Sequence, residues 1–149
     1  MIKIIILTVI SVYILWLILN FVLLIYKNAN TLNTFKKLEQ LFIKRYEIWD
    51  KFTLSEECRK YLEELKSLPQ GIKFLNRKLA LNYVISEQIR QNISQEELPD
   101  ECKIINAELS NIGEIYNDRA DILKRAVEIF PKSFFARFLN IKSTDYYRG

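Results

Sequence analysis

The chain has 149 residues, half of them hydrophobic, and its 22 basic and 18 acidic residues give a formal charge of +4. This length suits one domain of ordinary size, and a small charge of mixed sign argues against a dedicated nucleic-acid binder. Histidine is absent, so the residue that most often serves as acid–base catalyst and metal ligand cannot contribute to a site.

The first predicted element is a membrane helix. Residues 4–26 carry no charge, and only three weakly polar residues interrupt the apolar run. At 1.5 Å per residue this run covers the roughly 30 Å of a bilayer core. It exceeds a signal-peptide core, and no small-residue cleavage site follows, so we predict an uncleaved, single-pass anchor within residues 1–27 and a place in the cell membrane. Basic residues from Lys27 onward favour a cytoplasmic C-terminal domain.

Apolar residues in heptad steps predict a helix over residues 28–52, separate from the membrane helix or continuous with it, since no Gly or Pro intervenes. After Phe52 the stripe changes phase. Thr53 and Glu56 have the form of a capping box, which predicts a new helix near Thr53. A single kinked helix over residues 28–68 is the alternative. The predicted core positions are Phe35, Leu38, Phe42, Trp49, Phe52, Leu54, Cys58, Tyr61, Leu65 and Leu68.

Breaks at residues 69–71 and 94–100 delimit a third helix, and a last long helix spans roughly residues 100–130. The third helix has its apolar stripe at Ile72, Leu75, Leu79, Ile85 and Ile89, widened by Phe74, Leu81, Tyr83 and Val84. The last helix has its stripe at Ile105, Leu109, Ile112, Tyr116, Leu123, Ala126 and Phe130.

Two arginines, Arg45 and Arg119, fall on these apolar seams. We expect each stem to lie along the core, with the guanidinium in water or on a carboxylate. The carboxylates within reach by sequence are Glu39, Glu47, Asp118 and Asp121.

Two sequence motifs resemble the LemA family of bacterial membrane-anchored helical proteins. Tyr116-Asn117-Asp118 precedes thirteen residues that end in Phe130-Pro131, and Lys44-Arg45-Tyr46 follows Phe35 and Leu38-Glu39. The resemblance implies a transmembrane helix followed by an antiparallel up-and-down four-helix bundle, with three helices and a kinked first helix as the alternative. It also implies structural roles for Tyr46, Tyr116, Asn117, Phe130 and Pro131. Asp50 replaces a common family proline, Leu98-Pro99 matches a family loop only loosely, and the middle is shortened, so the chain resembles a divergent member.

The segment after Pro131 combines aromatic and basic residues. Its sequence SFFARFLNIK predicts a short amphipathic helix, and we nominate Phe134, Phe135, Arg137 and Phe138 as residues that bind a membrane or a partner. Packing on the bundle is the favoured expectation, and contact with the lipid surface is the alternative. The chain is thus divided into an anchor (1–27), a bundle (28–131) and a tail (132–149).

Chemistry has little support in this sequence. No serine or cysteine has a histidine to activate it, acidic pairs such as Glu56-Glu57 diverge around a helix, and Cys58 and Cys102 fit buried helix positions. We predict no catalytic residue, cofactor, metal or small-molecule substrate. The expected function is that of a membrane-anchored helical-bundle scaffold, and the alternative is a lipid-organising module that acts through the tail. The expected partners are the lipid bilayer and other proteins or a second copy, not nucleic acid.

Overall fold

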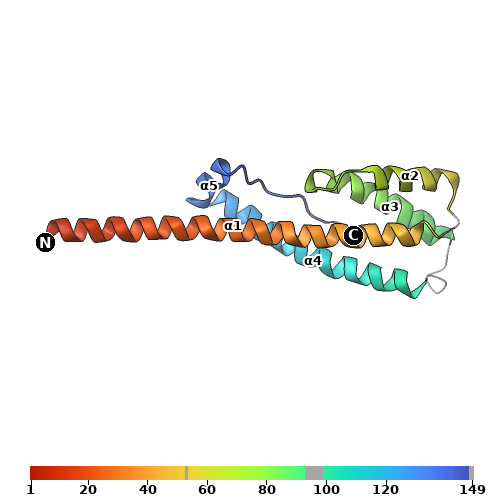
Figure 1. Cartoon of the computed structure of the whole chain (residues 1–149), viewed down its shortest axis with the longest axis horizontal. Helices are drawn as coiled ribbons and strands as arrows, with labels where there is room; N and C mark the ends of the chain where they lie inside the picture. The colour runs from red at the N-terminus through yellow and green to blue at the C-terminus, as the bar shows by residue number, and fades with distance from the viewer. Residues whose placement is uncertain (53, 93–98, 148–149) are drawn as a thin grey trace. The chain divides into compact units, whose positions relative to one another are not determined.

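The computed structural model describes residues 1–52, 54–92 and 99–147, and every regular element in these ranges is a helix (Figure 1). This confirms the predicted all-α fold with a long apolar N-terminal helix. The elements are α1 (Ile2–Trp49), α2 (Glu56–Ser67), the 3-10 helix η1 (Ile72–Phe74), α3 (Leu75–Asn92), α4 (Asp100–Glu128) and α5 (Lys132–Phe138).

Helix α1 is continuous for 48 residues, so the predicted membrane helix and the helix that follows it are one element. Its sequence contains no Gly or Pro to interrupt the backbone hydrogen bonds. The single kinked helix over residues 28–68 is wrong, because α1 ends at Trp49 and α2 begins at Glu56. Thr53 of the predicted capping box lies outside the described residues. Ser55 caps α2 instead, and its Oγ accepts a hydrogen bond from the Cys58 amide at 3.2 Å.

The predicted break at residues 69–71 is confirmed. Gly71 has a φ of 137°, a backbone conformation that glycine adopts without a steric penalty. The predicted last helix is also confirmed as α4, although the break before it lies mostly outside the described residues, Leu98 included.

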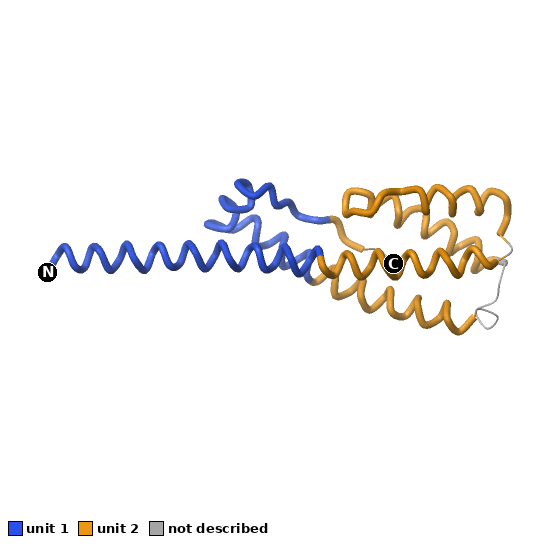
Figure 2. Tube along the Cα trace, in the orientation of Figure 1, with its two compact units in different colours: residues 1–32, 119–144 blue, residues 33–118, 145–149 orange. Residues whose placement is uncertain are grey.

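The chain forms two compact units that interleave along the sequence (Figure 2). Unit 1 comprises residues 1–32 and 119–144, and unit 2 comprises residues 33–118 and 145–149. Helices α1 and α4 each contribute one part to unit 1 and the other part to unit 2. The division into anchor, bundle and tail follows sequence order and remains a prediction.

Unit 2 packs four helical segments that run in alternating directions (Figure 2). The predicted seams supply most of its core, since Phe35, Leu38, Phe42 and Trp49 are all buried. Two predicted positions of α3 are wrong, because Tyr83 and Val84 are exposed. Further buried residues of unit 2 are Cys58, Leu62, Leu65, Leu75, Leu81, Ile85, Ile89, Cys102, Leu109 and Tyr116.

Unit 1 has a much smaller core, built where the last turns of α4 and the helix α5 pack on α1. Leu24 of α1 is fully buried against Leu123 and Ala126 of α4 and Ala136 of α5. The core therefore covers only the C-terminal part of the apolar stretch of α1.

Candidate functional site

After Lys3 the N-terminal part of α1 is apolar on every side, and little of it is covered by other parts of unit 1. From Ile2 to Leu19 every residue is exposed except Leu17, which is half-buried. This helix is long and apolar enough to cross a membrane. Thr8 and Ser11 bond to the carbonyls of Ile4 and Leu7, one helical turn back, so their hydroxyls are satisfied without water.

One candidate binding residue of the tail, Phe135, contacts the apolar stretch of α1, and so does Phe130 just before the tail. The ring of Phe135 meets that of Phe21 edge-on, with centroids 5.3 Å apart. The Phe130 ring lies against Trp16, with centroids 6.5 Å apart. Trp16 thus has a protein neighbour, and α5 packs on the apolar stretch of α1.

Four large apolar side chains at the end of α4 and on α5 remain uncovered within unit 1. We call Ile129, Phe130, Phe134 and Phe138 the aromatic ridge; their exposed fractions are 60%, 64%, 63% and 80%. Phe130 was predicted to lie on the buried stripe of the last helix, and this is wrong. Helix α4 ends at Glu128, so Phe130 leaves the helical phase that buries Leu123 and Ala126. Arg137 is exposed as well, and Pro131 is buried, with a cis peptide bond before it.

Unit 1 is strongly basic, although the whole chain is nearly balanced. Its two segments contain eight basic residues and two acidic ones, Asp121 and Glu128, a formal charge of +6. Unit 2 accordingly carries −2. An apolar ridge with basic residues around it is the pattern of a helix that lies in a membrane interface.

The family-motif residues Tyr116 and Asn117 hold the C-terminal segment of the chain in unit 2. The Tyr116 hydroxyl donates to the Asp145 carbonyl at 2.8 Å. The Asn117 side chain pairs with the backbone of Tyr147 in both directions, donating to its carbonyl at 2.8 Å and accepting from its amide at 2.6 Å. These hydrogen bonds join the C-terminal segment to α4. The structural roles that the family resemblance implies for these residues remain a prediction.

Tyr46, the remaining family-motif residue, is buried and stacks on Phe42 with ring centroids 6.1 Å apart. Its hydroxyl is sealed from solvent and has no hydrogen-bond partner in the described part of the chain. Burial raises the pKa of this hydroxyl above its ordinary value. Tyr46 lines a pocket of about 440 Å³ between α1, α2 and α3, but the sealed hydroxyl cannot reach a molecule there.

Arg45, whose guanidinium was expected in water or on a carboxylate, contacts an aromatic ring and a hydroxyl instead. Its guanidinium lies over the Trp49 ring, 4.4 Å from the centroid, and donates to the Ser86 hydroxyl at 3.0 Å. Burial lowers its pKa, because the charged form loses hydration. No described carboxylate pairs with it. Arg119 of unit 1 donates to the Asn30 carbonyl at 3.2 Å.

Sequence reasoning missed a buried ion pair in unit 2. The Lys78 ammonium donates to the Glu39 carboxylate at 2.7 Å, and both side chains are more than nine-tenths buried. The same carboxylate oxygen accepts the Gly71 amide at 2.8 Å. A lysine among the apolar residues of a helix pattern gives no signal of its partner 39 residues away. The pair joins α1 to α3 and to the turn before η1.

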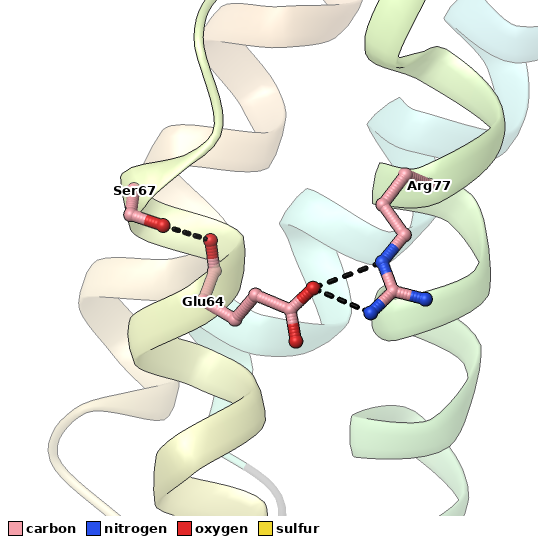
Figure 3. A network of polar contacts seen from close by, with 3 residues as sticks. All are labelled: Glu64, Ser67 and Arg77. Atoms are coloured by element: carbon pink, nitrogen blue, oxygen red, sulfur yellow. Dashed lines mark hydrogen bonds and ion pairs between the residues drawn. The ribbon is translucent and has the colours of Figure 1, made fainter.

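The other ion pairs are exposed. Arg77 of α3 donates through two nitrogens to one oxygen of Glu64 on α2, at 2.9 and 2.5 Å, while Ser67 bonds to the Glu64 carbonyl (Figure 3). Exposed pairs of this kind contribute about 0–1 kcal/mol. Figure 3 thus shows a surface link between two helices.

The described residues hold no group of three or more Cys, Asp or Glu side chains arranged to bind a metal ion. Cys58 and Cys102 are free and buried, as predicted, and burial raises the pKa of both thiols. A raised pKa keeps a thiol protonated and unreactive at neutral pH.

Comparisons of the chain with protein-family models, with curated proteins and with solved structures returned no match. The resemblance to the LemA family therefore remains an expectation carried by the motif residues alone.

Proposed function

We propose that this protein is a membrane-anchored helical protein of the LemA type that works by contact and not by catalysis. The observation that carries the proposal is the uncovered apolar helix from Ile2 to Leu19. A helix that is apolar on all sides favours an apolar environment, because in water its whole apolar surface would be exposed. A bilayer supplies that environment, and the helix satisfies its own backbone hydrogen bonds within it.

The charges of unit 1 support an orientation with α4 and α5 on the cytoplasmic side. Lys27 follows the apolar stretch directly, and the segment 119–144 adds six further basic residues to the same unit. Basic residues near the end of a membrane helix favour the cytoplasmic face. The segment packs on α1 at Phe21 and Leu24, close to the C-terminal end of the apolar stretch.

Unit 2 offers helix surfaces for contact with proteins. Apolar side chains of α3 and α4 remain exposed, with Tyr83 at 67% and Ile104 at 59%. Support for the LemA type comes from the motif residues, since Tyr116 and Asn117 both bind the backbone of the C-terminal segment. The aromatic ridge favours a second function, contact with lipid, which the next subsection develops.

Photo-crosslinking of the full chain in cells tests the contact role. We expect a photoreactive residue in place of Tyr83 or Ile104 to yield a defined protein adduct or a covalent dimer of this chain. Lys73, exposed on η1, is the matched control for random collisions. If the adducts at Tyr83 and Ile104 match those at Lys73 in identity and yield, the contact role is wrong.

A further inference from the structure

Two ring contacts fix the height of the aromatic ridge along α1. Phe135 meets Phe21 and Phe130 meets Trp16, and all four residues belong to unit 1. Trp16 precedes Phe21 by five residues, so Phe130 lies about 7.5 Å nearer the N-terminus of α1 than Phe135 does. Phe130 therefore lies beside the apolar helix, within its length. Phe134, whose ring meets that of Phe135 with centroids 5.7 Å apart, lies near the height of Phe21.

The basic residues of α4 limit how far the hydrocarbon core can reach along α1. Leu24 packs on Leu123 and Ala126, and the sequence neighbours between them are Lys124 and Arg125. Charged side chains at this height belong among headgroups, because they are costly in hydrocarbon. A core of about 30 Å then extends from Ile2 to about Phe21. The apolar residues 22–26, all exposed except the buried Leu24, then lie in the headgroup zone.

This placement puts Phe130 inside the lipid and Phe134 near its boundary. With the boundary near Phe21, Phe130 lies about 7.5 Å below it, the depth at which interfacial helices bury their apolar faces. Phe134 and Phe138 are four residues apart and share one face of α5. The ridge is continuous with a surface that already requires lipid, which makes lipid the occupant that fits it best.

Charge selects the kind of lipid. Between Lys124 and Lys142 the chain carries five basic residues and one acidic residue, Glu128. We propose that the aromatic ridge inserts into one leaflet as a second membrane contact beside α1, and that its basic surroundings direct it to anionic lipids. This proposal rests on the membrane anchoring proposed above and deepens it.

Tryptophan depth measurements on the full chain test the insertion. The variant Phe134→Trp, in a Trp16→Phe background, is reconstituted in vesicles of phosphatidylcholine and phosphatidylglycerol whose acyl chains are brominated near the headgroup. We expect the bromines to quench the new tryptophan, because an interfacial helix buries its apolar face at their depth. Trp49, at 1% exposed, adds the same unquenched background to every variant. Phe138→Trp is a second reporter, and neither position is packed in the core.

The control is Tyr83→Trp in the same background, since Tyr83 of unit 2 is as exposed as Phe134. Quenching of Phe134→Trp and Phe138→Trp but not of Tyr83→Trp supports insertion. If Trp16 of the parent is quenched by these bromines while both ridge reporters behave like Tyr83→Trp, the ridge proposal is overturned and the anchor stands. If Trp16 is not quenched either, the anchor fails too. Equal quenching of the ridge reporters in vesicles of phosphatidylcholine alone overturns the selection of anionic lipid.

Discussion

Gly113 lies in α4 where the aromatic ring of Tyr147 approaches the helix backbone. A Cβ at this position would overlap Cδ1 and Cε1 of that ring. Glycine costs a helix about 1 kcal/mol relative to alanine, so its presence here is explained by the docked tyrosine. Tyr147 is itself fixed by Asn117 and packs on Phe42.

The first prediction is that the effect of Gly113→Ala changes sign with Tyr147. In the parent, the substitution should lower the free energy of unfolding by about 1–3 kcal/mol, because the ring must move. In a Tyr147→Ala background it should raise that free energy by about 1 kcal/mol, through helix propensity alone. Urea unfolding of the detergent-solubilised chain, followed by Trp49 fluorescence, measures both. Stabilisation of the parent by Gly113→Ala would refute the docking of Tyr147.

The second prediction concerns the buried pair of Glu39 and Lys78. Lys78→Met should cost about 3–5 kcal/mol, because it leaves a buried carboxylate with only the Gly71 amide as partner. Adding Glu39→Gln removes that charge and keeps an acceptor for Gly71, so the double variant should recover most of the loss. The same urea titration measures both variants. A double variant as unstable as the single one would contradict the energetic coupling of Glu39 and Lys78.

At the scale of elements, the pattern of apolar residues predicted where the helices lie better than it predicted which of their side chains are buried. The seam from Phe35 to Trp49 is buried because its side chains share one face of α1. Tyr83 and Val84 carry the same apolar signal yet are exposed, because the buried face of α3 passes through Lys78, Asn82, Ile85 and Ile89. Periodicity does not reveal that Glu39 is the ion-pair partner of Lys78. It also did not predict that the C-terminal segment hydrogen-bonds to Asn117.

The predicted site had the same limits. Sequence identified the aromatic and basic residues of α5, since composition alone marks an amphipathic segment. It did not show that Phe135 packs inward on Phe21 while Phe134 and Phe138 remain exposed. That distinction depends on how α5 docks on α1, and the docking is a tertiary contact between residues more than a hundred positions apart.

The third prediction is that Ser55 starts α2. Its hydroxyl accepts the Cys58 amide and donates to Gln88 Oε1 at 3.2 Å, so Ser55→Ala removes the cap together with this exposed hydrogen bond. The substitution should lower the free energy of unfolding by about 1 kcal/mol. Ser67→Ala is the matched control, because Ser67 only donates to the Glu64 carbonyl at the exposed end of the helix. Equal losses from both substitutions would speak against the cap.

For the whole molecule, the fourth prediction is a loss of stability at alkaline pH. Burial raises the pKa of Cys58, Cys102, Tyr46 and Tyr147 in the folded chain. The unfolded chain then releases these protons first, from about pH 9 for the thiols and pH 10 for the phenols. The four protonated groups therefore make their full contribution to the free energy of unfolding below pH 9, and this contribution falls as the pH rises.

Urea titrations at pH 7 and pH 10 measure this loss. Tyr46→Phe should reduce it, and should stabilise the chain at pH 7 by about 1 kcal/mol, because an unpartnered buried hydroxyl is removed. A midpoint that does not change between the two pH values would contradict the burial of these groups.

The central claim is that lipid covers the apolar half of α1, and maleimide labelling of single added cysteines tests it most directly. Ile10 and Tyr83 are 50% and 67% exposed, so protein does not shield either position, and the parent with its two buried cysteines gives the background. In intact membranes we predict that Ile10→Cys remains unlabelled until detergent is added, while Tyr83→Cys is labelled in permeabilised membranes with or without detergent. Labelling of Ile10→Cys in membranes as fast as Tyr83→Cys would contradict the account.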